Sequence, residues 1–330
     1  MTESAPERFE APPRAVLETL SGAPRDVLLL GHVHPDADVL GTLFALGLAL
    51  EGAGWSPTFA GPHPVPGVLS FLPASARYQV WTAAPRHFGV IVLTDCPNDR
   101  RTEGLLEQAR GPESQVLNID HHPDNRRYGT VDWIDPAAAA TGEMVYQLVV
   151  ALGRPVTRDI ALNLFTAIHT DTGSFRYSNT TARTFRIAAE LTRAGAEPAL
   201  VTDWLYQRRP PGTLNELGEV LRRVAVSDDG RIAWLGVPRG LVSDSLVSSE
   251  DLVSYPRSLE GVKVAMLLRE EGPSAVKVSL RAKGDVAVNR IAGRFGGGGH
   301  ENAAGCTVPG GLDDVARTML AAIREALPPE

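Results

Sequence analysis

Three short apolar stretches of this chain run directly into aspartate or histidine residues, and this recurrence constrains the fold more than any other feature. The stretches, with the polar residues that follow, are residues 27–30 with His32, Asp36 and Asp38, residues 88–94 with Asp95, and residues 115–119 with Asp120, His121 and His122. Apolar stretches of this length are typical of buried strands. Because ligands bind beyond the carboxyl ends of parallel strands, we expect these polar residues to lie close together.

Helical patterns lie between and after these strands. We expect helices from the loop after residue 30 to about residue 51, and over residues 141–152, 159–169 and 181–194. Short apolar strands that alternate with helices are typical of βαβ units. The sequence therefore predicts an α/β fold whose N-terminal part is a mostly parallel sheet with flanking helices. A chain of 330 residues is long enough for about two domains.

The pattern changes after residue 195. Residues 196–225 are mostly helical around Arg208-Arg209-Pro210-Pro211-Gly212, so we predict a helical linker there. A packed helix pair is the alternative, since Pro-Pro-Gly only guarantees a break. Residues 231–237 resemble a strand, and the alternating stretches 262–269 and 275–281 resemble a hairpin. We predict a first domain over residues 1–195, the linker, and a smaller α/β domain with a mixed sheet over residues 226–330.

Composition excludes several classes of protein. The net charge of −7 argues against a protein that covers a long stretch of duplex DNA, which requires a basic surface. Two cysteines, Cys96 and Cys306, cannot form a disulfide framework. No window of about twenty apolar residues and no apolar signal-peptide core occurs. We therefore expect a soluble, cytoplasmic protein with no membrane association; a homodimer is left open.

The polar clusters match the ligands of a centre with two metal ions. Such a centre requires several oxygen ligands, one or two imidazoles and a carboxylate that bridges the metals. The residues that supply them are His32, Asp36, Asp38, Asp95, His121 and Asp171. Aspartate and histidine without cysteine favour Mn²⁺ or Mg²⁺ over zinc. Each residue alone also fits a structural role, such as a helix N-cap for Asp38 or an Asx turn for Asp171, but six such coincidences together favour the metal centre.

A run of four glycines precedes His300 near the end of the chain. Backbone amides without side chains can approach phosphate oxygens closely, and His300 and Arg281 would add positive charge. A flexible hinge is the alternative. Because the glycines stand between a predicted helix over residues 286–295 and Asn302-Ala303-Ala304-Gly305, we favour a loop that binds substrate.

These motifs, taken together and in this order, resemble the DHH family of phosphoesterases. The matching segments are His32-x-x-x-Asp36-x-Asp38, Asp95, Asn118-Ile119-Asp120-His121-His122-Pro123, Thr170-Asp171-Thr172-Gly173, and Phe295 to His300 with Asn302 to Gly305, which resembles the DHH-associated C-terminal domain. The resemblance spans about residues 27–305 and is strongest to the subgroup of nanoRNases that are also pAp phosphatases. Ala37 stands where many members have glycine, and Val39 follows Asp38; neither departure removes a ligand.

The resemblance assigns roles to individual residues. It implies that His32, Asp36 and Asp95 hold one Mn²⁺, and that Asp38, Asp95, His121 and Asp171 hold the other. It further implies that Asp120 orients a metal ligand and that His122 faces the scissile phosphate. It places the following residues at the substrate: Arg281, Gly297, Gly298, Gly299, His300, Asn302 and Arg101.

The resemblance also implies an activity. We expect a manganese-dependent hydrolase, with Mg²⁺ as an alternative ion, that degrades short single-stranded RNA or DNA oligonucleotides exonucleolytically to mononucleotides and converts pAp to AMP. A phosphodiesterase of cyclic or linear dinucleotides is the main alternative. An inorganic pyrophosphatase is less favoured because the C-terminal part is rich in glycine rather than in clamping lysines. A binding protein without catalysis is disfavoured by the complete set of ligands.

Overall fold

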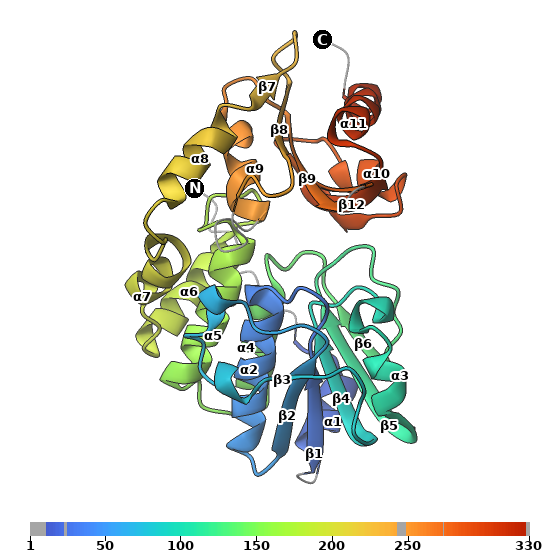
Figure 1. Ribbon diagram of the computed structural model, residues 1–330. Coiled ribbons are helices and arrows are strands. Elements are labelled where there is room, and N and C mark those ends of the chain that lie inside the picture. Colours follow the sequence, from blue (N-terminus) through green and yellow to red (C-terminus); the bar gives the residue numbers. More distant parts are fainter. Residues whose placement is uncertain (1–10, 23–24, 243–248, 273, 328–330) are drawn as a thin grey trace, which may run out of the picture. The chain divides into compact units, whose positions relative to one another are not determined.

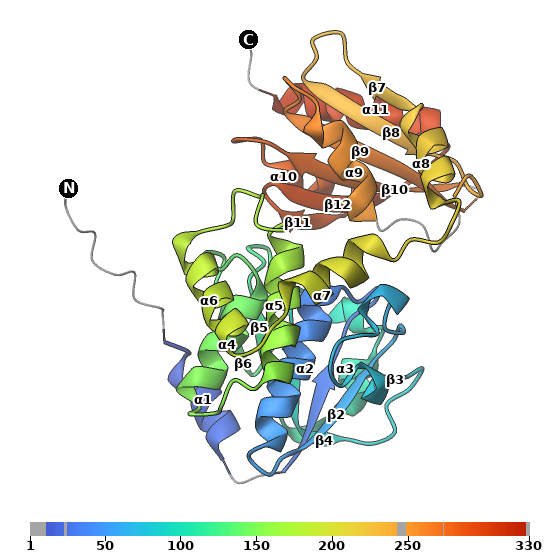
Figure 2. The same ribbon diagram turned by 90° about the vertical axis from the view of Figure 1, so that its left-hand side faces the viewer.

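Figures 1 and 2 show the computed structural model, which describes residues 11–22, 25–242, 249–272 and 274–327. The chain divides into two compact units, the first ending at Arg208 and the second beginning at Arg209. Each unit is built around its own six-stranded sheet and its own apolar core. Within the described residues, no helix combines the length and the apolar character that crossing a membrane demands.

The sheet of the first unit is parallel throughout, in the order β3-β2-β1-β4-β5-β6. Its strands are β1 (Asp26–Leu30), β2 (Ser56–Gly61), β3 (Gln79–Val80), β4 (Phe88–Thr94), β5 (Arg110–Asp120) and β6 (Val131–Ile134). The predicted parallel sheet is confirmed. The short strands β3 and β6 were not predicted, because two and four residues are too few for a periodic pattern.

Helices cover both faces of this sheet (Figure 1). They are α1 (Arg14–Ser21), α2 (Ala37–Glu51), α3 (Leu105–Ala109), α4 (Thr141–Ala151), α5 (Arg158–Asp171) and α6 (Ala182–Arg193), with short turns η1 (Gly67–Leu69), η2 (Ser75–Arg77) and η3 (Asp99–Thr102). Val27 and Leu29 of β1 pack in the core with α1, α2, α4, α5 and α6, whereas Leu28 and Leu30 pack with α3. Burial on both faces explains why this strand is continuously apolar.

The predicted linker over residues 196–225 is divided between the two units. Helix α7 (Pro198–Thr202) and the π-helical turn η4 (Asp203–Gln207) belong to the first unit, and α8 (Thr213–Leu221) belongs to the second. The break falls at Pro210-Pro211-Gly212, where Gly212 has a φ of 93° and precedes α8. Proline and a left-handed glycine are both incompatible with a continuous helix.

The second unit has a mixed sheet, as predicted. Its strand order is β11-β12-β10-β9-β8-β7. Its elements are β7 (Val224–Val226), β8 (Ile232–Val237), α9 (Ser249–Ser258), β9 (Val264–Gly272), β10 (Ala275–Ala282), α10 (Val288–Gly293), β11 (Gly298–His300), β12 (Ala303–Pro309) and α11 (Leu312–Ala326). Among the described strands of this second sheet, only the pair β8–β9 is parallel, and β9–β10 form the predicted hairpin. Helices α10 and α11 cover one face, and α8 and α9 cover the other.

Candidate metal centre

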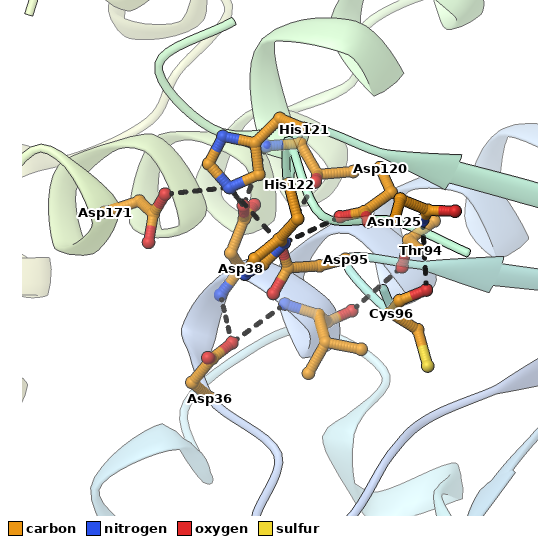
Figure 3. A network of polar contacts seen from close by, with 12 residues as sticks. Asp36, Asp38, Thr94, Asp95, Cys96, Asp120, His121, His122, Asn125 and Asp171 are labelled. Atoms are coloured by element: carbon orange, nitrogen blue, oxygen red, sulfur yellow. Dashed lines mark hydrogen bonds and ion pairs between the residues drawn. The ribbon is translucent and has the colours of Figure 1, made fainter. Parts of the chain in front are cut away.

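The predicted ligands gather where the strand order of the first sheet reverses. Strand β1 lies between β2 and β4. The chain continues from β1 to β2 on one side and from β4 to β5 on the other, so the two connections run in opposite directions along the sheet. Such a reversal opens a crevice at the carboxyl ends of the strands, where parallel sheets bind ligands. The loops after β1, β4 and β5 all begin at this edge of the sheet, and Figure 3 shows the side chains of Asp38, Asp95 and His121 close together there.

The loop from β1 to α2 places three of the ligands. His32 is completely buried, and Asp38 is buried within the first turn of α2. The N-cap of this helix is Asp36, whose Oδ1 accepts from the backbone amides of Asp38 and Val39, each at 3.1 Å. The capping role considered for Asp38 therefore belongs to Asp36, because Asp38 already lies inside the helix.

Asp95 is held in an unusual backbone conformation directly after β4. Its φ is 53°, in the left-handed region, which costs free energy for a residue with a side chain. Its amide donates to the carbonyl of Ile119 in β5 at 3.0 Å, and only 3% of the residue is exposed. Such conformations persist when the surrounding structure imposes them, and they are concentrated at functional sites.

Both predicted histidine ligands have one ring nitrogen committed to a backbone carbonyl. His32 Nδ1 lies 2.8 Å from the carbonyl of Val33, and His121 Nδ1 lies 3.1 Å from that of Ala138. Since a carbonyl oxygen only accepts, these contacts favour a proton on each Nδ1, and for His32 the carbonyl at 2.8 Å is closer than the Arg101 Nη2 donor at 3.2 Å. Each Nε2 then points its lone pair towards carboxylates, with His32 Nε2 at 3.9 Å from Asp95 Oδ2. This arrangement is the usual one for histidines that bind metal through Nε2.

The donor atoms form two groups that share one residue. His32, Asp36 and Asp95 offer ligand atoms within 4.8 Å of one another, and so do Asp38, Asp95 and His121. Asp171, the last residue of α5, extends the second group, since its Oδ2 lies 3.2 Å from His121 Nε2. The structure thus brings all six predicted metal ligands together, with Asp95 between the two groups.

The charges in this cluster call for a cation. Burial, together with the carboxylates of Asp95 and Asp171, raises the pKa of Asp38 well above its usual value. Burial opposes protonation of His121, but Asp171 and Asp95 outweigh it and raise the pKa of this imidazole well above its usual range. Among the described residues, the buried Nε2 of His32 has no hydrogen-bond partner, as expected of an atom reserved for a metal. The donor set fits a divalent cation with a preference for oxygen and imidazole.

Asp120 and His122 lie beside the second group. His122 Nδ1 donates to Asp120 Oδ1 at 2.8 Å, and Asn125 Nδ2 donates to Asp120 Oδ2 at 2.5 Å. Asp120 is completely buried, and both of its oxygens accept hydrogen bonds from these neighbouring side chains (Figure 3). His122 Nδ1 also lies 3.5 Å from Asp95 Oδ1. Burial raises the pKa of Asp95, whereas the imidazoles of His122, His121 and His32 lower it. The imidazoles outweigh burial and hold this pKa well below its usual value.

The residues predicted to bind substrate lie in both units. Arg101, in η3, places its Nη2 3.2 Å from His32 Nδ1 in the first unit. In the second unit, Arg281 of β10 and His300 of β11 are both paired with Ala303 of the intervening strand β12. Directly paired residues project to the same face of a sheet, so Arg281 and His300 share one face.

The second half of the glycine run lies in an edge strand, whereas the expectation was a loop. Gly298–His300 form β11, and the two residues Glu301 and Asn302 connect it to β12. A Cβ on Gly297 would meet the carbonyl oxygen of Gly305 at 2.0 Å, and one on Gly299 would meet that of Ala303 at 2.6 Å. The backbone carbonyl of Asn302 accepts from Ala282 at 2.9 Å. At least two of the glycines therefore allow close packing of backbones within the second unit.

Several residues that contact the ligands were not predicted. Thr141 is the first residue of α4, and its hydroxyl donates to Asp95 Oδ1 at 3.2 Å. Asn125 was not identified, and neither was Asn179, which donates to the carbonyls of Ala139 and Asp171 at 2.9 and 3.1 Å. Isolated amide and hydroxyl side chains form no spacing pattern, so the sequence carries little signal for them.

Comparison with known proteins shows which family the chain belongs to. Residues 26–168 match the DHH family, N-terminal domain, and residues 247–327 match the DHHA1 domain. The chain is 37% identical to the bifunctional oligoribonuclease and PAP phosphatase NrnA of Thermus thermophilus, over 99% of this chain and 98% of that protein. The protein of the same name from Bacillus subtilis is 28% identical over 86% of this chain and 89% of its own length.

A solved structure shows the same fold. The exopolyphosphatase-related protein from Bacteroides fragilis has a TM-score of 0.85 to this chain at 22% identity, covering 96% of this chain and 98% of that one. The two domain matches follow one another in the expected order, and the similarity to the Thermus protein extends over nearly the whole sequence. The chain belongs to the DHH family of phosphoesterases.

Proposed function

We propose that this protein hydrolyses short single-stranded oligonucleotides from one end to mononucleotides, and that it also converts pAp to AMP. The observation that carries the proposal is the position of Asp95, which contributes to both groups of metal-binding side chains. A carboxylate shared by two cation positions is typical of phosphoesterases that use two metal ions. The similarity to proteins named bifunctional oligoribonuclease and PAP phosphatase supports this choice of substrates.

Manganese is the ion that we propose for both positions, with magnesium as the substitute. His32, Asp36 and Asp95 would hold one ion, and Asp38, Asp95, His121 and Asp171 would hold the other. Carboxylates and imidazoles without thiolates are the ligands that Mn²⁺ accepts readily. When bound, such ions lower the pKa of a water molecule and neutralise charge on the phosphoryl oxygens.

The side chains around the ligands would complete the site. We assign to His122 the role of hydrogen-bonding the phosphate or donating a proton to the leaving oxygen. Its Nδ1 is held by Asp120, which would keep the ring in one orientation and would stabilise its protonated form. Burial lowers the pKa of His122, but Asp120 and Asp95 outweigh it and raise this pKa above its usual value, which favours a proton donor. Arg101, next to His32, would approach an anionic substrate.

The second unit would bind the end of the nucleotide chain. Arg281 and His300 project from the same face of the sheet and can both contact a phosphate. Gly297, Gly298, Gly299 and Asn302 lie in or next to the β11–β12 hairpin that carries His300, and we assign them to the same substrate-binding part of the unit. A grip on a terminal phosphate would suit short oligonucleotides and pAp alike, because each presents a phosphate near a scissile ester.

A substrate panel tests this proposal directly. The purified protein is incubated with Mn²⁺ and with pAp, RNA and DNA oligonucleotides of two to about twenty residues, linear and cyclic dinucleotides, and pyrophosphate, and the products are resolved by length. We expect mononucleotides from the short oligonucleotides, AMP from pAp, and no turnover in EDTA. Turnover of cyclic dinucleotides alone would favour the alternative phosphodiesterase, and turnover of pyrophosphate alone would contradict the proposal.

A further inference from the structure

The turn that leads into α4 contacts three of the proposed metal ligands at once. The carbonyl of Ala138 accepts from His121 Nδ1 at 3.1 Å. The amides of Thr141 and Gly142 donate to Asp38 Oδ2 and Oδ1 at 2.7 and 2.9 Å. Residues 138–142 thus contact the Nδ1 of an imidazole and both oxygens of a carboxylate.

The side chain of Thr141 adds a contact to the shared ligand. Its hydroxyl donates to Asp95 Oδ1 at 3.2 Å, and Thr141 is completely buried. The same residue therefore orients Asp38 through its backbone and Asp95 through its side chain. A hydroxyl that donates to a carboxylate fixes the rotation of that carboxylate, and with it the direction of the remaining lone pairs.

Asn179 connects the same turn to the fourth ligand of the second group. Its Nδ2 donates to the carbonyl of Ala139 at 2.9 Å and to the carbonyl of Asp171 at 3.1 Å. The backbone that carries Asp171 is thereby tied to the backbone that holds Asp38 and His121. All four residues of the second group are thus linked to residues 138–142: His121, Asp38 and Asp95 through their side chains, and Asp171 through its backbone.

The turn is itself held rigidly. Glu143, which is completely buried, accepts from Arg183 Nε and from Thr184 Oγ1, each at 2.6 Å, and from the amide of Ala139 at 3.3 Å. A Cβ on Gly142 would meet side-chain atoms of Ala167 and Ile168 at 3.0 Å, so α4 packs closely against α5, the helix that ends in Asp171. Burial and charge pairing therefore leave the turn little freedom to move.

We infer that residues 138–142, with Thr141 as the central positioning residue, preorganise the second group of ligands for its metal ion. This inference rests on the proposed metal-dependent function. It adds a set of contacts that orient the ligands and that the ligands themselves do not supply. Each ligand of that group is oriented through the turn, so loss of a contact would loosen metal binding without removing a ligand. Groups that orient metal ligands in this way typically contribute about 10- to 100-fold to metal affinity.

Titration of the metal-free protein with Mn²⁺ by calorimetry tests the inference. Thr141→Val keeps the shape of the side chain and removes the hydroxyl, whereas Thr141→Ser keeps the hydroxyl. We expect Thr141→Val to weaken one of two Mn²⁺ binding events by about 10- to 100-fold and to leave the other within about threefold, and Thr141→Ser to bind like the parent. Thr166→Val is the matched control, because Thr166 is a buried threonine whose hydroxyl donates to the carbonyl of Leu162 instead of to a ligand.

Two results would overturn the inference. One is a Thr141→Val protein that binds both ions as tightly as the parent, and the other is a Thr141→Ser protein that loses as much affinity as Thr141→Val. Circular dichroism of the metal-free variants shows whether they are folded. If Thr141→Val does not fold, Asn179→Ala decides in its place, since it should weaken the same binding event; parental affinity in that variant would refute the inference. A parent protein that binds no Mn²⁺ would overturn the proposed function as well, so the two failures are distinguishable.

Discussion

Replacing Asp95 by asparagine tests the shared ligand while preserving its shape. Asp95 Oδ1 lies 3.4 Å from His121 Nε2 and 3.5 Å from His122 Nδ1, and Oδ2 lies 3.9 Å from His32 Nε2. The two oxygens thus face different groups of ligands. Asparagine would keep one oxygen and present an amide that cannot bind a cation, so both proposed metal positions would be weakened by one substitution.

The size of the effect follows from the loss of a direct ligand. Removing a group that merely orients a ligand costs about 10- to 100-fold in metal affinity, so the loss of a shared ligand should exceed about 100-fold at each position. We expect kcat to fall by at least about a thousandfold, which corresponds to about 4 kcal/mol in the activation free energy. Mn²⁺ at 100 times its dissociation constant should stabilise the parent by about 2.7 kcal/mol, and it should barely stabilise the variant.

Two assays report these quantities. Steady-state hydrolysis of pAp and of a short oligoribonucleotide gives kcat, and the melting temperature with and without Mn²⁺ gives the stabilisation, about 5–10 °C for the parent. Asp159→Asn, an exposed aspartate in the first turn of α5, is the matched control and should behave like the parent. A folded Asp95→Asn protein with more than about a tenth of the parental kcat would refute the reasoning.

Three further predictions concern other parts of the molecule. Glu143→Gln should lower the free energy of unfolding by about 3 kcal/mol in a denaturant titration, because it removes the carboxylate charge that lies closest to the largely buried guanidinium of Arg183, whereas Asp135 lies farther away at 3.4 Å; an unchanged midpoint would contradict this. Gly297→Ala should destabilise the second unit by about 2 kcal/mol, since its Cβ would meet the Gly305 carbonyl oxygen at 2.0 Å; a thermal melt equal to that of the parent would contradict it. His300→Ala should raise KM for pAp by about tenfold and leave Mn²⁺ content unchanged, and unaltered kinetics would show that His300 has only a structural role.

The fold and the gathering of the candidate ligands could be predicted because each leaves a pattern in the sequence. Continuous apolar stretches such as residues 88–94 indicate strands buried on both faces, and the parallel sheet confirms them. His32, Asp95 and His121 follow such stretches closely. Because parallel strands bind ligands beyond their carboxyl ends, these three residues could be expected to lie close together. Asp171 follows no strand, and its place at the end of α5 was expected only from its motif.

The remaining features depend on contacts that no residue pattern encodes. The amides of Thr141 and Gly142 hold Asp38 across more than a hundred residues of sequence, and any residue type supplies a backbone amide. The glycine run was expected to be a loop, because its composition favours turns. Gly298 and Gly299 instead lie in an edge strand, since β12 offers a partner and the absent side chains allow the backbones to approach. Packing between distant parts of the chain, rather than local composition, determines these backbone contacts and the conformation of the glycine run.

The central claim is that two divalent cations bind on either side of the Asp95 carboxylate. An anomalous-difference map from crystals soaked in Mn²⁺ tests it most directly. We predict two peaks, one contacted by His32, Asp36 and Asp95 and the other by Asp38, Asp95, His121 and Asp171. A map without peaks at Asp95, from crystals of protein that is active in the same Mn²⁺ solution, would contradict the claim.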